Sequence, residues 1–147
     1  MNYDEVEILL VEDSMDDAIL TIRALLKSGC TNKLFHVKDG AEALDFIYCK
    51  GAYALRKSKE NLKLILLDLK MPKVTGMEVL EKIKSDVDLK STPVVILTSS
   101  KEDPDIKKCY ALGANSYTVK PVDSDNFFSV IKDIGLYWMI LSEPPHS

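Results

Sequence analysis

Five short apolar segments alternate with five segments that carry helical patterns, and no other feature of the sequence restricts the fold as much. The strand-like segments are Glu7–Val11, Leu34–Val37, Leu64–Leu67, Pro93–Thr98 and Ser116–Val119. The helix-like segments are Met15–Ser28, Ala41–Tyr48, Gly76–Ser85, Pro104–Leu112 and Asp125–Leu141. This alternation predicts an α/β fold: a five-stranded, doubly wound parallel sheet with right-handed crossovers and helices on both faces.

The length of the chain predicts one domain. Its 147 residues are enough for a compact unit with a substantial core and too few for two typical domains. We expect a single domain over residues 1–147, with its core at about 7–141 and a short Pro-rich tail at 142–147. Residues 51–63 hold a basic and polar run, which predicts a long solvated connection before the third strand.

The composition argues against several classes of protein. The net charge of −4 leaves no basic excess to neutralise phosphates, which argues against nucleic-acid binding. The apolar runs are too short for a bilayer and the start lacks the positive segment of a signal peptide, so we expect a cytoplasmic protein without membrane contact. Cys30, Cys49 and Cys109 are widely spaced and predict free thiols, and neither His36 nor His146 has neighbours that suit metal binding.

Asp68 directly follows the four apolar residues Leu64–Leu67 and precedes a Pro-containing loop. A continuous apolar run of this kind predicts an inner parallel strand that is buried on both faces. Ligands of open α/β sheets gather beyond the carboxyl ends of the strands, so Asp68 is a candidate functional residue. Taken alone, the pattern is equally compatible with an aspartate that only caps a turn.

Polar residues also follow the other strands. The first strand ends in Glu12 and Asp13, the fourth in Thr98, and the fifth in Lys120. If these strands are neighbours, three carboxylates share one edge and would repel each other without a cation. Lys120 offsets one negative charge and leaves two, which matches Mg²⁺ and its preference for oxygen ligands. Asp68 could then accept a phosphoryl group whose oxygens contact Lys120 and Thr98.

Four motifs together resemble the receiver domain of two-component response regulators. In chain order they are Val11–Ser14 (VEDS), Leu67–Pro72 (LDLKMP), Val95–Thr98 (VILT) and Tyr117–Pro121 (YTVKP). Each motif alone is weakly specific, but the similarity keeps its order over about residues 7–141. The resemblance implies a flavodoxin-like receiver that is no enzyme in its own right. It implies a protein that is phosphorylated by a sensor histidine kinase, assists its own phosphorylation and dephosphorylation, and signals through protein contacts.

The resemblance also implies a role for each residue at the strand ends. Asp68 would accept the phosphoryl group, assisted by Thr98 and Lys120. The implied Mg²⁺ ligands are the side chains of Glu12, Asp13 and Asp68 and the main-chain carbonyl of Lys70. Thr98 and Tyr117 would form the switch pair, in which Thr98 moves toward the phosphoryl group and Tyr117 turns inward. The Lys120–Pro121 peptide bond would be cis.

Two positions depart from the commonest receiver pattern. Lys70 stands where the family often has asparagine, and Ser99 follows the switch threonine where alanine or glycine is frequent. Lys70 either occupies the route of the attacking water, and so alters the lifetime of the phosphoryl group, or points to solvent.

The final helix-like segment is more apolar than one inward-facing stripe requires. Its apolar residues are Phe127, Phe128, Val130, Ile131, Ile134, Leu136, Tyr137, Trp138, Met139, Ile140 and Leu141. Packing inside the domain accounts for part of this excess, and a subunit interface would account for the rest. We therefore expect a homodimer through this region.

A narrower similarity is to stand-alone receivers that partner bacterial phytochromes, which implies a phytochrome-type kinase. It rests on the 51–63 connection, Asp123, the Trp-containing end and the absence of an output domain. A phosphatase of the aspartate-nucleophile type would need a second acid where Lys70 stands, and a flavodoxin-like cofactor binder would not place Glu12 and Asp13 beside a phosphate. A receiver that binds partners without being phosphorylated stays open as an alternative.

Overall fold

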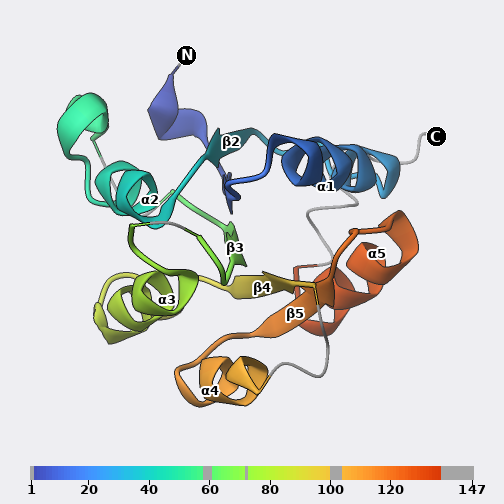
Figure 1. Cartoon of the computed structure of the whole chain (residues 1–147). Coiled ribbons are helices and arrows are strands. Elements are labelled where there is room, and N and C mark those ends of the chain that lie inside the picture. The colour runs from blue at the N-terminus through green and yellow to red at the C-terminus, as the bar shows by residue number, and fades with distance from the viewer. Residues whose placement is uncertain (1, 58–60, 72, 100–103, 137–147) are drawn as a thin grey trace.

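In the described part of the chain, five parallel strands form one sheet at the centre of the molecule (Figure 1). The computed structural model describes residues 2–57, 61–71, 73–99 and 104–136. The strands are β1 (Ile8–Val11), β2 (Leu34–Val37), β3 (Leu64–Asp68), β4 (Val94–Thr98) and β5 (Ser116–Val119). They lie in the order β2-β1-β3-β4-β5, and each neighbouring pair is parallel, which confirms the predicted sheet.

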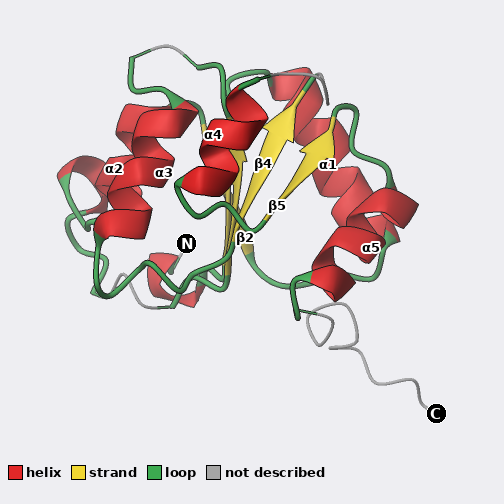
Figure 2. Ribbon diagram, turned by 90° about the horizontal axis from the view of Figure 1, so that it is seen from below, coloured by secondary structure: helices red, strands yellow, loops and turns green. Residues whose placement is uncertain are grey.

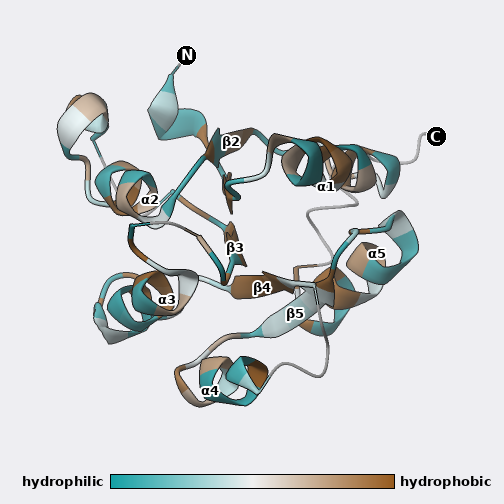
Figure 3. Ribbon diagram, viewed as in Figure 1, coloured by the Kyte–Doolittle hydropathy of each residue, from teal (hydrophilic) through white to brown (hydrophobic). Residues whose placement is uncertain are grey.

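Helices cover both faces of this sheet, as predicted (Figure 2). On one face lie α1 (Met15–Lys27) and α5 (Ser124–Asp133). On the other lie α2 (Gly40–Ile47), α3 (Gly76–Ser85) and α4 (Asp105–Ala111). Alternate residues of the inner strands pack toward the two layers, so these strands are buried on both sides. The hydropathy colouring shows β4 as an apolar strand (Figure 3).

Most of the helices begin at a capping residue close behind a strand. The side chains of Ser14, Asp39, Thr75 and Asp123 accept hydrogen bonds from the backbone N–H groups of the first turns of α1, α2, α3 and α5. Each cap therefore fixes the first turn of its helix at the carboxyl edge of the sheet. In α1 this places the first-turn residue Asp17 in contact with Lys120, which follows β5.

The connection between α2 and β3 is exposed over most of its described residues, as predicted, but three of its side chains are buried. Gly51–Tyr53 form a short 3₁₀ helix, and Tyr53, Arg56 and Leu62 are buried. Arg56 Nη1 donates hydrogen bonds to the carbonyl oxygens of Phe46 and Ile47 at the end of α2, at 3.0 and 3.2 Å. The sequence did not predict these contacts, because arginine is usually exposed and the carbonyl groups that Arg56 contacts lie nine and ten residues earlier in the chain.

An aromatic cluster ties the connection to the N-terminal segment. The rings of Tyr3, Phe35, Phe46 and Tyr53 lie 5.1 to 5.8 Å apart between centroids. The backbone N–H of Lys57 donates to Asp4 Oδ1 at 2.7 Å. The segment before β1 is thus packed against the rest of the domain.

The last helix ends earlier than predicted. It ends at Asp133 because Gly135 adopts a left-handed φ of 85° and the N–H of Leu136 donates back to the carbonyl oxygen of Ile131 at 3.0 Å. This is the hydrogen-bond pattern with which a glycine closes a helix. Residues 137–141, over which the helix was predicted to continue, lie outside the described residues.

In α1 only some of the apolar side chains face the sheet. Ala18, Ala24 and Leu25 are buried against the sheet, whereas Ile19 and Leu26 are exposed by 41% and 58%. The buried face of α1 is therefore narrow and consists mainly of small residues. Within the described ranges, no helix is both long enough and apolar enough to cross a lipid bilayer.

Candidate functional site

Strand register brings the predicted site residues to one edge of the sheet. Val11 pairs with Leu67, Asp68 pairs with Leu97, and Thr98 pairs with Val119. The residues that follow β1, β3, β4 and β5 are consequently level with one another. The strands β1, β3, β4 and β5 are neighbours in the sheet, as the predicted site requires.

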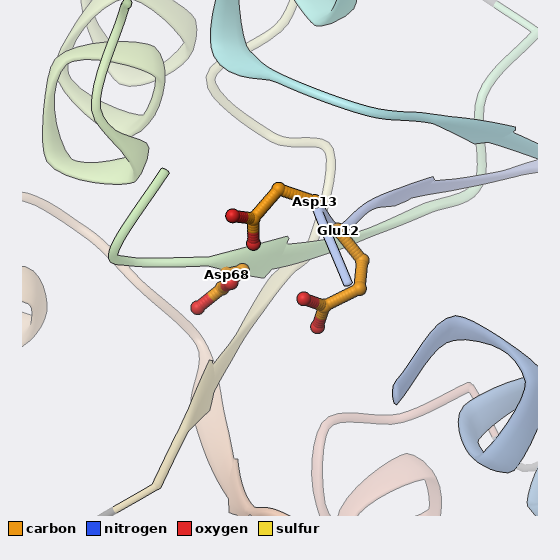
Figure 4. Close-up of side chains that lie close together, drawn as sticks. All are labelled: Glu12, Asp13 and Asp68. Atoms are coloured by element: carbon orange, nitrogen blue, oxygen red, sulfur yellow. The ribbon is translucent and has the colours of Figure 1, made fainter. Parts of the chain in front are cut away.

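Three carboxylates meet at this edge (Figure 4). Glu12, Asp13 and Asp68 each offer an oxygen, and these oxygens all lie within 4.8 Å of one another. Glu12 and Asp68 are buried, whereas Asp13 is exposed. Such a set of oxygen donors around one small space suits a divalent cation.

The ammonium group of Lys120 lies among the same carboxylates. Lys120 Nζ is 2.9 Å from Glu12 Oε1, 3.2 Å from Asp17 Oδ2 and 3.3 Å from Asp68 Oδ2. The contact with Asp17 also has hydrogen-bond geometry. The peptide bond between Lys120 and Pro121 is cis, which confirms the expectation from the receiver resemblance.

Main-chain groups hold the two buried carboxylates in place. The N–H of Ser14 donates to Glu12 Oε2 at 3.2 Å, and the N–H of Lys70 donates to Asp68 Oδ1 at 3.3 Å. His36 Nε2 lies 2.7 Å from the carbonyl oxygen of Glu12, so this histidine on β2 has a hydrogen-bond partner in the main chain. Among the described residues the partner of the buried Glu12 Oε1 is Lys120 Nζ, at 2.9 Å. A bound cation would give this oxygen and those of Asp13 and Asp68 a shared second partner, so the residues present fit Mg²⁺.

Burial dominates the electrostatics of the site. Desolvation raises the pKa of Glu12 from 4.5 to about 7, against the opposing effect of Lys120. Desolvation also raises the pKa of Asp68, although Lys120 lowers it. Burial acts to lower the pKa of Lys120, but the contacts with Glu12, Asp68 and Asp17 together raise it above its ordinary value. Without a metal ion, Lys120 therefore does not offset the full cost of ionising the buried carboxylates.

A cavity of about 260 Å³ surrounds these groups. Its lining includes the three carboxylates, Asp17, Lys70, Thr98, Ser99 and Lys120. Thr98 is buried at the end of β4, and the exposed Lys70 lies at the rim. Tyr117 is half-buried on β5, with its ring centroid 6.2 Å from that of Tyr110 on α4.

Asp17 is the residue at this site that the sequence argument missed. It lies in the first turn of α1, and its backbone N–H donates to the N-cap oxygen of Ser14 at 3.2 Å. A carboxylate in the first turn after an acidic strand end was the available signal. That signal is shared by Asp16, which is exposed, so the sequence alone could not select between the two.

The described fold and site match a known family over most of the chain. The family described as "Response regulator receiver domain" matches residues 8–132. The chain belongs to this family, whose members are phosphoacceptor signalling modules rather than conventional enzymes. The receiver class and the flavodoxin-like receiver fold, both expected from the sequence, are thereby confirmed.

Individual relatives agree with this assignment. Response regulator Rcp1 of Synechocystis sp. is 38% identical over 132 residues, covering 90% of this chain and 88% of Rcp1. The structure of bacteriophytochrome response regulator RtBRR has a TM-score of 0.85 at 48% identity, covering 95% of this chain and 84% of that one.

Two further solved structures contain a bound metal ion or a phosphorylated protein. A Mn²⁺-bound form of Rcp1 has a TM-score of 0.73 at 37% identity, covering 91% of this chain and 94% of that one. The phosphorylated cyanobacterial phytochrome response regulator RcpA has a TM-score of 0.73 at 38% identity, covering 92% and 94%. The chain is therefore similar to receivers that have been solved with a divalent metal and in a phosphorylated state.

Proposed function

We propose that Asp68 accepts a phosphoryl group from the phosphohistidine of a sensor kinase, in a reaction that needs Mg²⁺. The observation that carries this proposal is the convergence of Glu12, Asp13, Asp68 and Lys120 at the end of one sheet. Side chains of Glu12, Asp13 and Asp68 would hold the metal together with the main-chain carbonyl of Lys70. When bound, Mg²⁺ supplies positive charge that neutralises carboxylate and phosphoryl oxygens.

The protein's own groups position the reacting carboxylate. In the transfer, an oxygen of Asp68 attacks phosphorus, a P–O bond forms, the P–N bond to the kinase histidine breaks, and the imidazole leaves. The N–H of Lys70 fixes the Asp68 carboxylate, and Lys120 lies close enough to contact a phosphoryl oxygen once it arrives. Hydrolysis by a water from the cavity would later release phosphate, which is the self-dephosphorylation expected of this class.

Thr98 and Tyr117 are proposed to transmit the phosphorylation state. Thr98 lines the cavity around Asp68, and Tyr117 is half-buried on the neighbouring strand β5. Added phosphoryl oxygens offer acceptors toward which the Thr98 hydroxyl can turn, and Tyr117 can then move inward. The affected surface would consist of α4, β5 and α5, where a protein partner would read the change.

The proposed kinase is of the phytochrome type. The chain is similar to RtBRR and RcpA, which are described as phytochrome response regulators, and to the response regulator Rcp1. Output through protein contacts suits the net charge of −4, which disfavours binding to nucleic acid. Cys30, Cys49 and Cys109 form no disulfide, which suits the reducing cytoplasm in which we place the reaction.

Acetyl phosphate provides a direct test without knowledge of the kinase. The protein is incubated with acetyl phosphate and Mg²⁺ and its intact mass is measured. We expect a gain of one phosphoryl group, lost on chelation of Mg²⁺ before the reaction and absent in Asp68→Asn, because that variant has no carboxylate nucleophile. Asp39→Asn is a control that removes a carboxylate from the next βα loop. If the wild type gains no mass, the alternative of a receiver that only binds partners is favoured.

A homodimer through the region after β5 remains part of the proposal. Within this region Phe127, Val130 and Ile131 are buried inside the domain, while Phe128 is only partly buried. In the sequence, five further apolar residues follow at positions 137–141, and a subunit interface would cover such residues. We expect light scattering to give a dimer mass at high protein concentration, with or without phosphorylation. A monomer mass under both conditions would rule the dimer out.

A further inference from the structure

Lys120 contacts one carboxylate that has no place among the proposed metal ligands. We infer that Asp17 is a positioning residue: it holds Lys120 in the unphosphorylated protein and releases it when a phosphoryl group is present on Asp68. Asp17 would thereby lower the fraction of protein that is phosphorylated at a given donor concentration. This inference rests on the proposed phosphoacceptor function and adds a regulating residue to the same site.

The geometry makes Asp17 a direct partner of the lysine. Lys120 Nζ donates to Asp17 Oδ2 at 3.2 Å, and both residues line the cavity around Asp68. The first turn of α1 is fixed by its N-cap, because Ser14 Oγ accepts from the N–H of Asp17 at 3.2 Å. The Asp17 carboxylate is therefore held at the end of α1, and its contact with Lys120 joins this helix to the end of β5.

Exposure determines which carboxylate can release the lysine. An ammonium group has three N–H donors, and three carboxylates already surround this one. Side-chain exposure is 0% for Glu12, 7% for Asp68 and 36% for Asp17. Glu12 and Asp68 are buried, so replacing their lysine contact would cost more than replacing that of Asp17, whose carboxylate water can hydrate. Asp17 is the contact that a phosphoryl oxygen can replace at the smallest cost.

The negative charge of Asp17 also disfavours phosphorylation of Asp68. Glu12, Asp13, Asp17 and Asp68 contribute −4 when ionised and Lys120 contributes +1, so the site carries −3 with Asp17 and −2 without it. A phosphoryl group adds further negative charge close to Asp68. Asp17 therefore opposes phosphorylation twice, by occupying the lysine and by repelling the incoming group. Only the first of these effects requires contact with Lys120, and a double-variant cycle with Lys120 measures that contact separately.

The test compares Asp17→Asn with Asp16→Asn. Both variants remove one carboxylate from the first turn of α1, but Asp16 is exposed and is absent from the lining of the cavity. Each is titrated with acetyl phosphate in Mg²⁺, and phosphorylated protein is measured by intact mass. We expect Asp17→Asn to lower the half-saturating concentration of acetyl phosphate about fivefold, as for loss of one partly exposed charge contact. Asp16→Asn should match the wild type, and Asp17→Glu should restore part of the wild-type behaviour.

A second measurement needs neither metal nor phosphoryl donor. Thermal unfolding of the wild type, Asp17→Asn, Lys120→Met and the double variant forms a cycle in Mg²⁺-free buffer. We expect the effects of the two substitutions to be non-additive, whereas the same cycle with Asp16→Asn should be additive. Equal half-saturating concentrations for Asp17→Asn and Asp16→Asn, in a protein that is phosphorylated, would refute the inference and leave the phosphoacceptor intact. Absence of phosphorylation in the wild type would instead refute the proposed function, and the inference with it.

Discussion

In Mg²⁺-free buffer the protein is expected to lose stability as the pH rises from about 4.5 through about 7, and Mg²⁺ is expected to restore it. Burial raises the pKa of Glu12 from 4.5 to about 7, so the folded protein binds this proton more tightly than the unfolded chain. The contribution is present in full below the unfolded pKa of 4.5 and is lost as the pH rises through the folded value. Its upper limit is on the order of 3 kcal/mol.

Mg²⁺ should reverse this dependence, because the metal binds the ionised carboxylate and its binding releases the proton. The rise in the thermal midpoint on adding Mg²⁺ should therefore grow between pH 5 and pH 8. Differential scanning fluorimetry at several pH values, with Mg²⁺ or with chelator, measures both effects.

Glu12→Gln provides the comparison for this experiment. A neutral amide cannot titrate, so this variant should lose most of the slope in Mg²⁺-free buffer and most of the stabilisation by Mg²⁺. Asp68, whose pKa is also raised by burial, should contribute the slope that remains. Glu81→Gln changes an exposed glutamate on α3 and should follow the wild type. A wild-type curve that is parallel to that of Glu12→Gln would contradict the burial argument.

Gly76→Ala is expected to destabilise the protein by about 3 kcal/mol, as for severe overpacking of a buried position. A Cβ atom at Gly76 would collide with the carbonyl oxygen of Asp68 and lie 2.8 Å from Leu69 Cα. The collision is with backbone, so no side-chain rotation relieves it. The end of β3 would have to move, and the Asp68 carboxylate would move with it.

Urea unfolding and the acetyl phosphate reaction together measure this effect. We expect a lower unfolding midpoint and a slower gain of phosphoryl mass in Gly76→Ala. Glu81→Ala, at an exposed position of the same helix, should change stability by no more than about 0.5 kcal/mol. Wild-type stability in Gly76→Ala would mean that the loop after β3 adapts without cost.

Much of the site could be predicted because parallel strands impose a simple rule on it. All strands of such a sheet end at one edge, so the polar residues after Val11, Leu67, Leu97 and Val119 had to meet once the strand order was known. Strand ends are visible in a sequence as the point at which an apolar run stops. The same rule gives no information on side chains that reach the edge from helices, and Asp17 was missed for this reason.

The other differences arise from contacts that are distant in sequence. Tyr53 and Arg56 lie in a polar segment, and only the fold brings Tyr53 against Tyr3 and Arg56 against the end of α2. The error at the end of α5 has a local cause. Gly135 is a signal for a helix terminus, but the apolar residues after it suggested that the helix continues. Ile19 is apolar but exposed, since helical spacing does not tell how wide the buried face is.

The packing of Tyr3 has a practical consequence for work on fragments of this protein. A truncated chain that starts at Glu7 would keep each residue of the proposed phosphoacceptor site. It would nevertheless lose the ring that packs against Phe35 and Phe46, and the Asp4 carboxylate that accepts from Lys57. Fragments for spectroscopy or crystallisation should therefore retain Asn2 onward, and an affinity tag at this end needs a flexible spacer so that it does not disturb the aromatic cluster.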